Sequence, residues 1–563
     1  MSASEPFETR TEPSPGPSNG LPPADVLRRF VTRLLEREGA PSASCAAATD
    51  PEVRAAAAQA LATKLAARTA RIAILGQGYV GLPLAARLVE AGFRVDGIEP
   101  DPERAAAIAA GAPRLGPAAP ALAARLAAPL AAGDYQIHTD PAELARADVA
   151  LVCVPTPLGP DRRPDLTAVR AAGEALGRHL APGTLAVLES TTYPGTTRGA
   201  FRDALIDGRG QSVEAKPRTA CAPSMDAEAT EALAGASTGT STGGPNAAPD
   251  ESRTAPLTAA PDASDLFVAY SPEREDPGRA EAEQAAAPKL VGGLTADAEE
   301  LAAALYESAF AHVHRTEGAE VAEAAKLFEN VFRAVNIALV NEAKTVLEAM
   351  GIDVWKVLDA AATKPFGFMP FEPGPGLGGH CIPIDPFYFA WAAEEAGVPA
   401  RFVELAGEVN RAMPSYVTGR LEEALEARAK AFAPEPGQGS SPSEPPTGLR
   451  GAHVLVLGLA YKPGVADVRE SPALDLIDRL LLAGAHVECA DPYVEQATTP
   501  GGAELASVPL TAERIATADA VLVVTDHEAF DWQLVALHCR LVVDTRGILR
   551  PFAKVLGARL VRA

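Results

Sequence analysis

The sequence is short of cysteine, of basic charge and of long apolar runs, and each shortage excludes a class of protein. Its six cysteines are spread over 563 residues without a CxxC pair or a Cys/His cluster of zinc spacing, so no metal site is expected. With 50 basic against 73 acidic residues, the net charge of -23 argues against binding to nucleic acid or anionic membranes. No stretch approaches the roughly 20 apolar residues of a membrane span.

These absences favour a cytoplasmic protein. Scattered free thiols fit a reducing compartment, and the chain does not open on a basic segment followed by an apolar core, as a secretory leader does. A chain of 563 residues is long enough for several domains.

Low-complexity segments divide the chain. Residues 1–70 are expected to be a mostly disordered extension with an Ala-rich helix over residues 52–67, so that the folded body begins at Arg71. Residues 208–264 are rich in Ser, Thr, Gly, Pro and Ala and are predicted to be an insertion in one surface loop. Residues 434–449 are predicted to be a linker.

Between these segments, apolar strands alternate with helices in two regions. The first set of expected strands covers residues 71–75, 95–98, 148–154, 185–188 and 266–270. The second covers residues 453–458, 487–490, 520–524 and 541–543. This alternation predicts an α/β fold with two Rossmann-like, doubly wound parallel sheets, joined by a central helical region with a long helix over residues 320–350.

A dinucleotide fingerprint follows the first strand. In Gly76-Gln77-Gly78-Tyr79-Val80-Gly81 the glycines permit a tight turn and close approach of the backbone to a pyrophosphate at a helix N-terminus. Glu99 ends the second strand, where a carboxylate can accept hydrogen bonds from ribose hydroxyls and favours NAD over NADP. Arg104 complicates that preference, because a cation there can meet a 2′-phosphate.

Two threonines follow later strands of the first sheet. Thr156 lies in Val154-Pro155-Thr156-Pro157, and Thr191 follows Glu189-Ser190. Ligands bind such sheets outside the carboxyl ends of the strands, where both hydroxyls are expected. Either motif is explained equally well as a helix-capping turn.

The stretch Gly378-Gly379-His380-Cys381 carries the strongest chemical signal. A ligand can closely approach a thiol beside glycines, and a neighbouring His can shift that thiol toward thiolate. Together with a nicotinamide cofactor, a nucleophilic cysteine favours oxidation of an alcohol to an acid through a thio-linked intermediate. His380 either tunes the thiol or only packs.

A polar stripe marks the long helix. Its members, at i, i+3, i+7 and i+10, are Glu323, Lys326, Asn330 and Arg333. A solvated charged face is the default explanation of such a stripe. The same helix also carries four apolar residues, Phe328, Phe332, Leu339 and Val340. They predict burial on more than one side, with the stripe facing a wet cavity.

Three further charged residues lie near expected element ends. Asp385 precedes Pro386 and a helical run, so it is expected at the N-cap, from which its side chain can face the loop of Cys381. Lys462 and Arg469 follow the first strand of the second sheet, where cations suit a diphosphate. Solvated loop charges explain Lys462 and Arg469 equally well.

Taken in order, these motifs resemble those of the UDP-glucose/GDP-mannose dehydrogenase family, the nucleotide-sugar 6-dehydrogenases. The resemblance runs from Arg71 to Ala563, apart from the insertion and the linker. Besides the fingerprint and the motifs of Thr156, Thr191 and Cys381, it rests on Tyr270-Ser271-Pro272-Glu273-Arg274, Lys326-Leu327-Phe328-Glu329-Asn330, Tyr461-Lys462 and Arg469-Glu470-Ser471-Pro472.

The resemblance implies oxidation of the C6 hydroxymethyl of a UDP-sugar to a carboxylate, with two NAD+ and no metal. The implied catalytic residues are Cys381 as nucleophile, Lys326 as general acid/base or oxyanion stabiliser, and Asn330, Asp385 and Glu273. The implied NAD contacts are Gly76, Gly78, Tyr79, Val80, Gly81, Glu99, Arg104, Thr156, Thr191 and Arg469. The implied substrate contacts are Arg274, Lys326, Asn330, Arg333, Gly378 and Lys462.

The resemblance also implies the domains and the assembly. Residues 71–316 would bind NAD, residues 317–433 would form a catalytic and dimerising centre, and residues 450–563 would bind the UDP-sugar. The central helix would form a homodimer.

The motifs are most similar to those of UDP-N-acetylglucosamine (or galactosamine) 6-dehydrogenases, whose products feed capsule, O-antigen or other surface polysaccharides. UDP-N-acetylmannosamine and UDP-glucose are the alternative substrates. Glu372 departs from the family pattern, because an aromatic residue is common at that position.

Two other interpretations are weaker. A two-electron dehydrogenase of the 6-phosphogluconate type shares the fold class but needs no thiol such as that of Cys381. An inactive nucleotide-sugar sensor is expected to have lost Cys381 or Lys326, and both residues are present.

Overall fold

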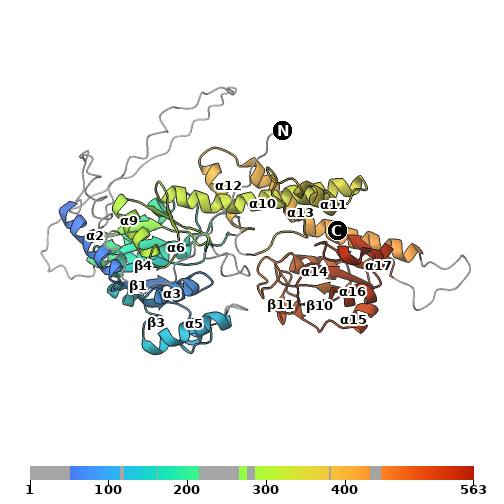
Figure 1. The fold of residues 1–563 in the computed structure, drawn as a ribbon, viewed down its shortest axis with the longest axis horizontal. Coiled ribbons are helices and arrows are strands. Elements are labelled where there is room, and N and C mark those ends of the chain that lie inside the picture. The colour runs from blue at the N-terminus through green and yellow to red at the C-terminus, as the bar shows by residue number, and fades with distance from the viewer. Residues whose placement is uncertain are drawn as a thin grey trace, which may run out of the picture.

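The computed structural model describes residues 51–113, 119–159, 161–214, 265–274, 286–379, 382–431 and 446–563. They form two α/β lobes bridged along one side by long helices (Figure 1), which confirms the expected fold class. His380 and Cys381 lie outside the described residues, as do most of the N-terminal extension, the insertion and the linker.

The first lobe is built on one eight-stranded sheet. Its strands are β1 (Arg71–Leu75), β2 (Arg94–Ile98), β3 (Tyr135–His138), β4 (Val149–Val152), β5 (Leu185–Leu188), β6 (Phe267–Tyr270), β7 (Lys289–Gly293) and β8 (Val313–Arg315). They lie in the order β3-β2-β1-β4-β5-β6-β7-β8, and all neighbours are parallel except β6 and β7. The order reverses between β1 and β4, where doubly wound sheets open a crevice for ligands.

Helices cover both faces of this sheet. They are α2 (Pro51–Ala66), α3 (Gly81–Glu90), α4 (Pro102–Ala109), α5 (Ala119–Ala132), η2 (Pro141–Arg146), α6 (Thr167–His179), η3 (Thr197–Phe201), α7 (Arg202–Glu214) and α9 (Ala296–Tyr306). Ile72 and Ile74 of β1 belong to one core, and Ala73 and Leu75 to the other, as the two-residue period of a strand dictates.

Two expected boundaries are wrong. The folded body begins before Arg71, because α2 is packed into the first core through Ala58, Leu61 and Leu65. The helix itself lies where the Ala-rich pattern predicts it. At the other boundary, α7 continues to Glu214, so the first residues of the expected insertion belong to a helix.

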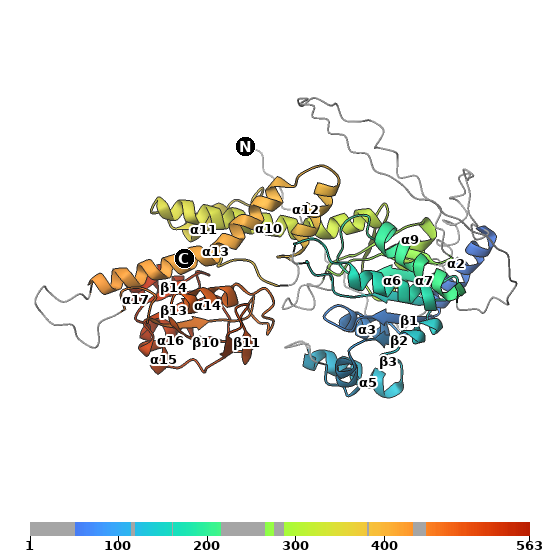
Figure 2. The same cartoon turned by 180° about the vertical axis from the view of Figure 1, so that it is seen from behind.

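Four helices form the central region: α10 (Ala319–Ala349), α11 (Val354–Ala362), α12 (Asp385–Glu395) and α13 (Arg401–Ala431). With 31 residues α10 is about 46 Å long, and it extends from the first lobe to the second (Figure 2). None of the described helices combines the length and apolar composition that a membrane crossing requires.

The apolar residues of α10 are not all buried as expected. Val340 is buried, but Phe328, Phe332 and Leu339 are 62%, 42% and 63% exposed. Their spacing predicts burial, whereas this chain on its own leaves the three side chains uncovered.

The second lobe contains a five-stranded parallel sheet. Its strands are β9 (His453–Leu457), β10 (His486–Ala490), β13 (Ala520–Val523), β14 (Val542–Asp544) and β15 (Leu560–Arg562), in the order β10-β9-β13-β14-β15. The remaining elements are α14 (Pro472–Leu482), the β11 (Gln496–Thr498) and β12 (Glu504–Ala506) hairpin, α15 (Ala512–Thr517), α16 (Trp532–His538), η5 (Arg550–Phe552), α17 (Ala553–Leu556) and η6 (Gly557–Arg559).

Helix α13 belongs to two parts of the molecule. It packs along α10 in the central region. Its later residues Val417, Leu421 and Leu425 join Val454 and Val456 of β9 in the core of the second lobe. The helix therefore fixes the second lobe to the central region.

A buried ion pair joins β5 to β7 in the first lobe. Lys289 Nζ lies 2.6 Å from Glu189 Oε2, and neither side chain is more than 2% exposed. The hydroxyl of Tyr306 donates to the other carboxylate oxygen, and Lys289 Nζ also donates to the Pro272 carbonyl at 3.1 Å. Burial alone would lower the pKa of Lys289, but the carboxylates of Glu189 and Glu273 outweigh burial and raise it.

We predict that Lys289→Met lowers the free energy of unfolding by about 3–5 kcal/mol, because Glu189 is then buried without its counter-charge. Denaturant unfolding followed by circular dichroism measures the loss. The matched control is Lys430→Met, which removes an exposed pair with Glu426 and is expected to be near neutral. Equal stability of the two variants would contradict the assigned role of the buried pair.

Candidate active site

The turn between β1 and α3 contains three glycines with different structural roles. Gly76 has a φ of +87°, and a Cβ there would lie 2.4 Å from the Cys153 carbonyl oxygen. A Cβ on Gly81 would lie 1.9 Å from the Gly76 carbonyl oxygen. A Cβ on Gly78 would meet nothing within 4 Å. Packing therefore requires Gly76 and Gly81, whereas Gly78 leaves open space at the start of α3, where a pyrophosphate can approach the backbone.

Glu99 comes directly after β2, at the end of the second strand where it was predicted, and its carboxylate binds this turn. Its carboxylate accepts hydrogen bonds from the backbone N–H of Gln77 at 3.0 Å and of Asp101 at 3.2 Å. Arg104 Nη1 lies 3.5 Å from the same carboxylate. Because Arg104 is paired in this way, its charge is offset by Glu99, which favours ribose hydroxyls over a 2′-phosphate.

Tyr79 and Arg469 meet although they come from different lobes. The guanidinium carbon of Arg469 lies 4.6 Å from the centre of the Tyr79 ring, a cation–π distance. Arg469 is also held by the Asp467 carboxylate, with Nη2 at 2.6 Å. The structure thus brings a predicted residue of the second lobe to the dinucleotide turn.

The two threonines follow β4 and β5. Thr156 is buried, and the hydroxyl of Tyr388 in α12 donates to the carbonyl of the next residue, Pro157, at 3.1 Å. Thr191 is half-buried. Thr156 therefore lies where the first lobe meets the central helices.

Three predicted catalytic residues, Lys326, Asn330 and Asp385, form a buried polar cluster in the central region. Asn330 Nδ2 donates to Asp385 Oδ2 at 2.6 Å, and Lys326 lies one turn before Asn330 on α10. All three side chains are buried. Burial raises the pKa of Asp385 to about 6, although the charge of Lys326 and the hydrogen bond from Asn330 both act to lower it. A carboxyl group poised in this way can exchange protons near neutral pH.

Asp385 does not cap α12 as expected. It is the first residue of the helix, and the N-cap is Ile384. The carboxylate turns instead to Asn330, so its hydrogen bond joins α12 to α10.

The other members of the predicted stripe have different positions. Glu323 is buried, and its carboxylate accepts from the backbone N–H of Gly195 at 2.6 Å and of Thr197 at 2.8 Å. It therefore caps the start of η3, and burial raises its pKa to about 7. Arg333 is exposed on α10, outside the buried cluster.

Glu273 and Arg274 follow β6. The Glu273 carboxylate lies 3.5 Å from Lys289 Nζ and accepts from the backbone N–H of Arg274 at 2.6 Å. Arg274 pairs with Glu329 of α10 at 2.6 Å. Lys289, which no motif in the sequence marks as a site residue, therefore anchors Glu273.

The loop that precedes Cys381 is fixed to the central helix α10 and to the second lobe. The N–H of Gly374 donates to Asn341 of α10 at 2.9 Å, and the N–H of Gly379 donates to the Arg469 carbonyl at 3.0 Å. A Cβ on Gly378 would lie 2.7 Å from the Cβ of Tyr461, so this glycine is required by packing against the second lobe.

Two cations of the second lobe lie near this loop. Lys462 Nζ is 5.8 Å from the ring centre of Tyr461, the residue on which Gly378 packs. Arg546 was missed: it follows β14, and its Nη1 would lie 2.6 Å from a Cβ on Gly374. Glu372 lies close enough to raise the pKa of Arg546, although burial lowers that pKa overall. The position of Arg546 at a strand's carboxyl end is the signal that could have identified it.

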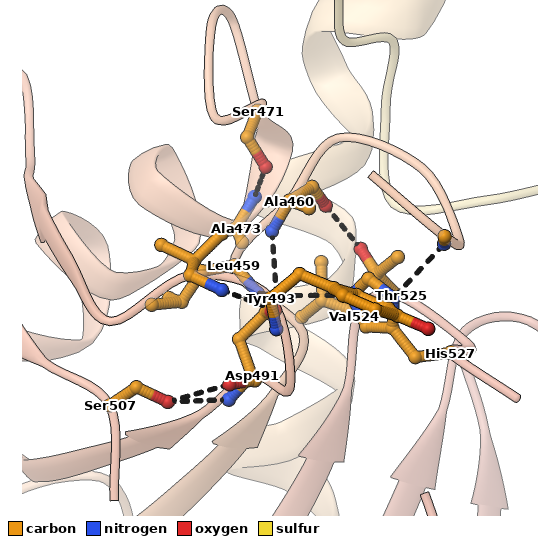
Figure 3. Close-up of polar contacts among 12 residues, drawn as sticks. Leu459, Ala460, Ser471, Ala473, Asp491, Tyr493, Ser507, Val524, Thr525 and His527 are labelled. Atoms are coloured by element: carbon orange, nitrogen blue, oxygen red, sulfur yellow. Dashed lines mark hydrogen bonds and ion pairs between the residues drawn. The ribbon is translucent and has the colours of Figure 1, made fainter. Parts of the chain in front are cut away.

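Figure 3 shows how the second lobe builds its own turn. Asp491, which follows β10, accepts from the backbone N–H of Leu459 at 2.7 Å and of Ala460 at 3.0 Å. His527 Nδ1 accepts from the Gly464 N–H, so Nε2 carries the proton that is shared with Asp491 at 3.0 Å. Burial would raise the pKa of Asp491, but the hydrogen bonds from His527 and the backbone outweigh burial and lower it.

Comparison with known proteins matches all three parts of the chain to one family. Residues 70–232 match the NAD binding domain of the UDP-glucose/GDP-mannose dehydrogenase family, residues 320–412 its central domain and residues 455–551 its UDP binding domain. The chain belongs to the UDP-glucose/GDP-mannose dehydrogenase family. It is thus an NAD-dependent nucleotide-sugar dehydrogenase, as the sequence motifs indicated, and the space beside Gly78 fits its cofactor.

Similar proteins differ in the sugar that their names specify. A UDP-N-acetyl-D-glucosamine 6-dehydrogenase of Pseudomonas aeruginosa is 31% identical over 75% of this chain and 83% of its own. A UDP-N-acetyl-D-mannosamine dehydrogenase of Pyrococcus horikoshii is 30% identical over 85% of this chain and 96% of its own. A solved structure of the Pyrococcus horikoshii UDP-D-ManNAc dehydrogenase superposes with a TM-score of 0.66 at 28% identity, covering 87% of this chain and 98% of that one.

We predict that Gly78→Ala folds like the parent but binds NAD at least roughly tenfold more weakly, because its methyl group occupies the space of the pyrophosphate. Calorimetric titration with NAD and thermal unfolding measure the two properties. Gly419→Ala, at a glycine of α13 that also has open space, is the control. Unchanged NAD affinity in Gly78→Ala would refute the assigned role of this turn.

Proposed function

We propose that this enzyme oxidises the C6 hydroxymethyl of UDP-N-acetylglucosamine or UDP-N-acetylgalactosamine to the uronate, in four electrons. The observation that supports this proposal is the buried cluster of Lys326, Asn330 and Asp385. Asp385 is four residues after Cys381 in the sequence. A nucleophilic thiol and a proton-exchanging carboxyl group are the two functions that a thioester route requires.

The chemistry balances with two equivalents of cofactor. When bound, each NAD+ accepts one hydride. Loss of the first hydride and a proton turns the alcohol into an aldehyde. Cys381 adds to the aldehyde carbon as the thiolate, and the proton that left its thiol goes to the aldehyde oxygen, which forms a thiohemiacetal. Loss of a second hydride and a proton gives a thioester. Water then cleaves the carbon–sulfur bond, which releases the carboxylate and restores the thiol.

Each residue of the cluster has a role in this scheme. Lys326 stabilises the oxygen of the reacting carbon, because a buried ammonium is an effective partner for developing negative charge. Asp385 takes the proton of the attacking water, and Asn330 holds the Asp385 carboxylate in place. Glu273, anchored by Lys289, assists proton movement from the side of the first lobe.

The substrate contacts come from several elements of the second lobe and its neighbours. Lys462 and Arg546 suit the diphosphate, since both follow strands of the second sheet. Gly378 lets the loop approach the ligand, and we also assign substrate contacts to Arg274 and Arg333. Glu372 offsets the charge of Arg546, and we expect it to weaken diphosphate binding.

The names of similar proteins support an N-acetylated sugar. Besides the glucosamine and mannosamine enzymes, a protein of Ralstonia nicotianae named NDP-N-acetyl-D-galactosaminuronic acid dehydrogenase is 30% identical over 85% of this chain and 96% of its own. UDP-N-acetylmannosamine and UDP-glucose are the alternatives. The uronate would enter a surface polysaccharide, and a reducing compartment such as the cytoplasm suits a reaction that depends on a free thiol.

An exposed apolar stripe supports a homodimer. Its members are Val321, Phe328, Phe332, Leu339 and Val346 of α10 and Met350 at the C-cap of that helix, all at least 42% exposed. They recur at intervals of seven and four residues, so they form one seam along the helix. Apolar stripes of this kind mark protein–protein interfaces, and the seam suits a second copy of α10.

The direct test is the stoichiometry of the reaction on a panel of sugars. Purified enzyme is supplied with NAD and, separately, with UDP-N-acetylglucosamine, UDP-N-acetylgalactosamine, UDP-N-acetylmannosamine, UDP-glucose and GDP-mannose. We expect fastest turnover with one of the first two and two NADH per sugar consumed. One NADH per sugar would contradict the thioester route, and a preference for another sugar would contradict the substrate assignment.

The acid limb of activity tests the role of Asp385. Its pKa of about 6 predicts that kcat/KM falls below about pH 6, where the base is protonated. Asn330→Ala removes a hydrogen bond that stabilises the ionised form, so the limb should move to higher pH. Asn336→Ala, which removes an exposed amide bonded to the Phe332 carbonyl, is the control. A limb that stays in place in Asn330→Ala would exclude Asp385 as the titrating group.

A further inference from the structure

A cavity lies between the far half of α10 and the second lobe, away from the cluster of Lys326 and Asp385. Its volume is about 460 Å³, within the range of small-molecule sites. Its walls come from the end of α10, the turn into α11, the middle of α13 and the last strand β15. Lys344, which lines it, is 18 residues after Lys326 on α10, about 27 Å along the helix.

Among the residues that line this cavity, cations outnumber acids by one; Glu423, outside the lining, also pairs with Arg420 at 2.5 Å. Three of its lining residues are cationic, namely Lys344, Arg420 and Arg562, and two are acidic, namely Glu348 and Asp353. Both acids are already engaged, Glu348 by Arg420 and Asp353 by Arg562. Lys344 therefore brings a positive charge that these two ion pairs leave unbalanced.

The Lys344 ammonium is the unusual group. Its side chain is 2% exposed, and among the described residues Nζ finds no hydrogen-bond partner. Nζ faces the ring of Tyr416, whose centre lies 5.4 Å away. The Tyr416 hydroxyl donates to Glu348, so this carboxylate already accepts from Tyr416 as well as pairing with Arg420. A buried ammonium without an acceptor is costly, so a ligand that supplies one is favoured.

The rest of the lining is apolar. Trp355, Leu560 and Val561 line the same cavity, and Trp355 also packs against Gly547, three residues past the end of β14 (a Cβ on Gly547 would lie 2.7 Å from the indole). An aromatic or aliphatic body fits such a wall.

We propose that this cavity binds a small organic anion, whose carboxylate or phosphate pairs with Lys344 and whose apolar body lies against Trp355. In this proposal the site is distinct from the cofactor and UDP-sugar sites, and it does not rest on the proposed function. Arg546, which we assign to the diphosphate, is near enough to act on the charge of Lys344. Because it is built from α10, α13 and β15 together, its ligand would hold the second lobe against the central helices.

The protonation of Lys344 should make anion binding depend on pH. Burial lowers the pKa of Lys344 to about 8; Glu348 and Asp544 act to raise it, and Arg546 and Arg420 act to lower it. An anion favours the charged ammonium, so binding takes up a proton when the pH is near or above this pKa. The affinity of the parent protein for the anion should therefore fall as pH rises above about 8.

Ligand-observed NMR titration of the full-length protein with benzoate tests the proposal. We expect saturable binding that Lys344→Met weakens about 10- to 100-fold, the effect of losing one charged hydrogen bond. Lys430→Met, at an exposed lysine of α13, should leave the affinity unchanged. Phenyl phosphate should bind like benzoate, and acetate, which lacks the apolar body, should bind more weakly.

Other outcomes overturn the proposal. They are the absence of saturable binding, displacement of benzoate by UDP, acetate binding as tight as that of benzoate, or equal affinity in Lys344→Met. The pH series on the parent protein is independent of any variant: an affinity that does not fall above about pH 8 also contradicts a role for Lys344.

Discussion

The site depends on one buried hydrogen bond, from Asn330 of α10 to Asp385 at the start of α12, beside Lys326. Burial of a carboxyl group is unfavourable unless it is partnered, and here the partner amide and the nearby ammonium come from the helix that joins the lobes. The same bond fixes the start of α12. Earlier in the chain, the Gly379 N–H ties the loop after α11 to the second lobe through the Arg469 carbonyl. The buried cluster therefore joins α10 to α12, and Leu327 and Tyr388 of these two helices pack into a core of the first lobe.

The two sheets share one structural feature, a carboxylate that binds the turn after the first strand, but the two turns differ. In each, a carboxylate after the second strand binds backbone N–H groups of the turn after the first strand: Glu99 in the first lobe and Asp491 in the second. In the first lobe the turn keeps an open space at Gly78 for a cofactor. In the second lobe the Asp491 carboxylate that binds the turn also accepts a hydrogen bond from His527, so its oxygens are engaged by protein groups. Cations then lie on the loops beyond it, where Lys462 and Arg546 suit a diphosphate.

Sequence patterns predicted the parts that depend on neighbours along the chain. The apolar run before Gly76 and the spacing of Lys326 and Asn330 have local signatures, and the structure places the turn and the cluster accordingly. Strands β3, β7 and β8 of the first sheet and β15 of the second were missed. Each is short and includes polar residues or glycine among few apolar ones. The pairing of Glu189 with Lys289, 100 residues apart, has no local signature. The contact between Tyr79 and Arg469 also joins distant positions.

The apolar residues of α10 show a different limit. Phe328, Phe332 and Leu339 have the spacing of a buried helical face, but they are exposed in this chain. A face covered by the same chain and a face covered by a second copy have the same periodicity. Spacing alone therefore predicts that such residues are buried in the working molecule and leaves open which chain covers them.

The most direct test of the account is the mass of the enzyme during turnover. Asp385→Asn should still form the thioester but hydrolyse it slowly, because the base that activates water is lost. Mass spectrometry of this variant, quenched in the presence of NAD and UDP-N-acetylglucosamine, should find the acyl adduct of the nucleotide sugar on the peptide of Cys381, and none in Cys381→Ser. NADH formation without an adduct, or an adduct on another residue, would contradict the account.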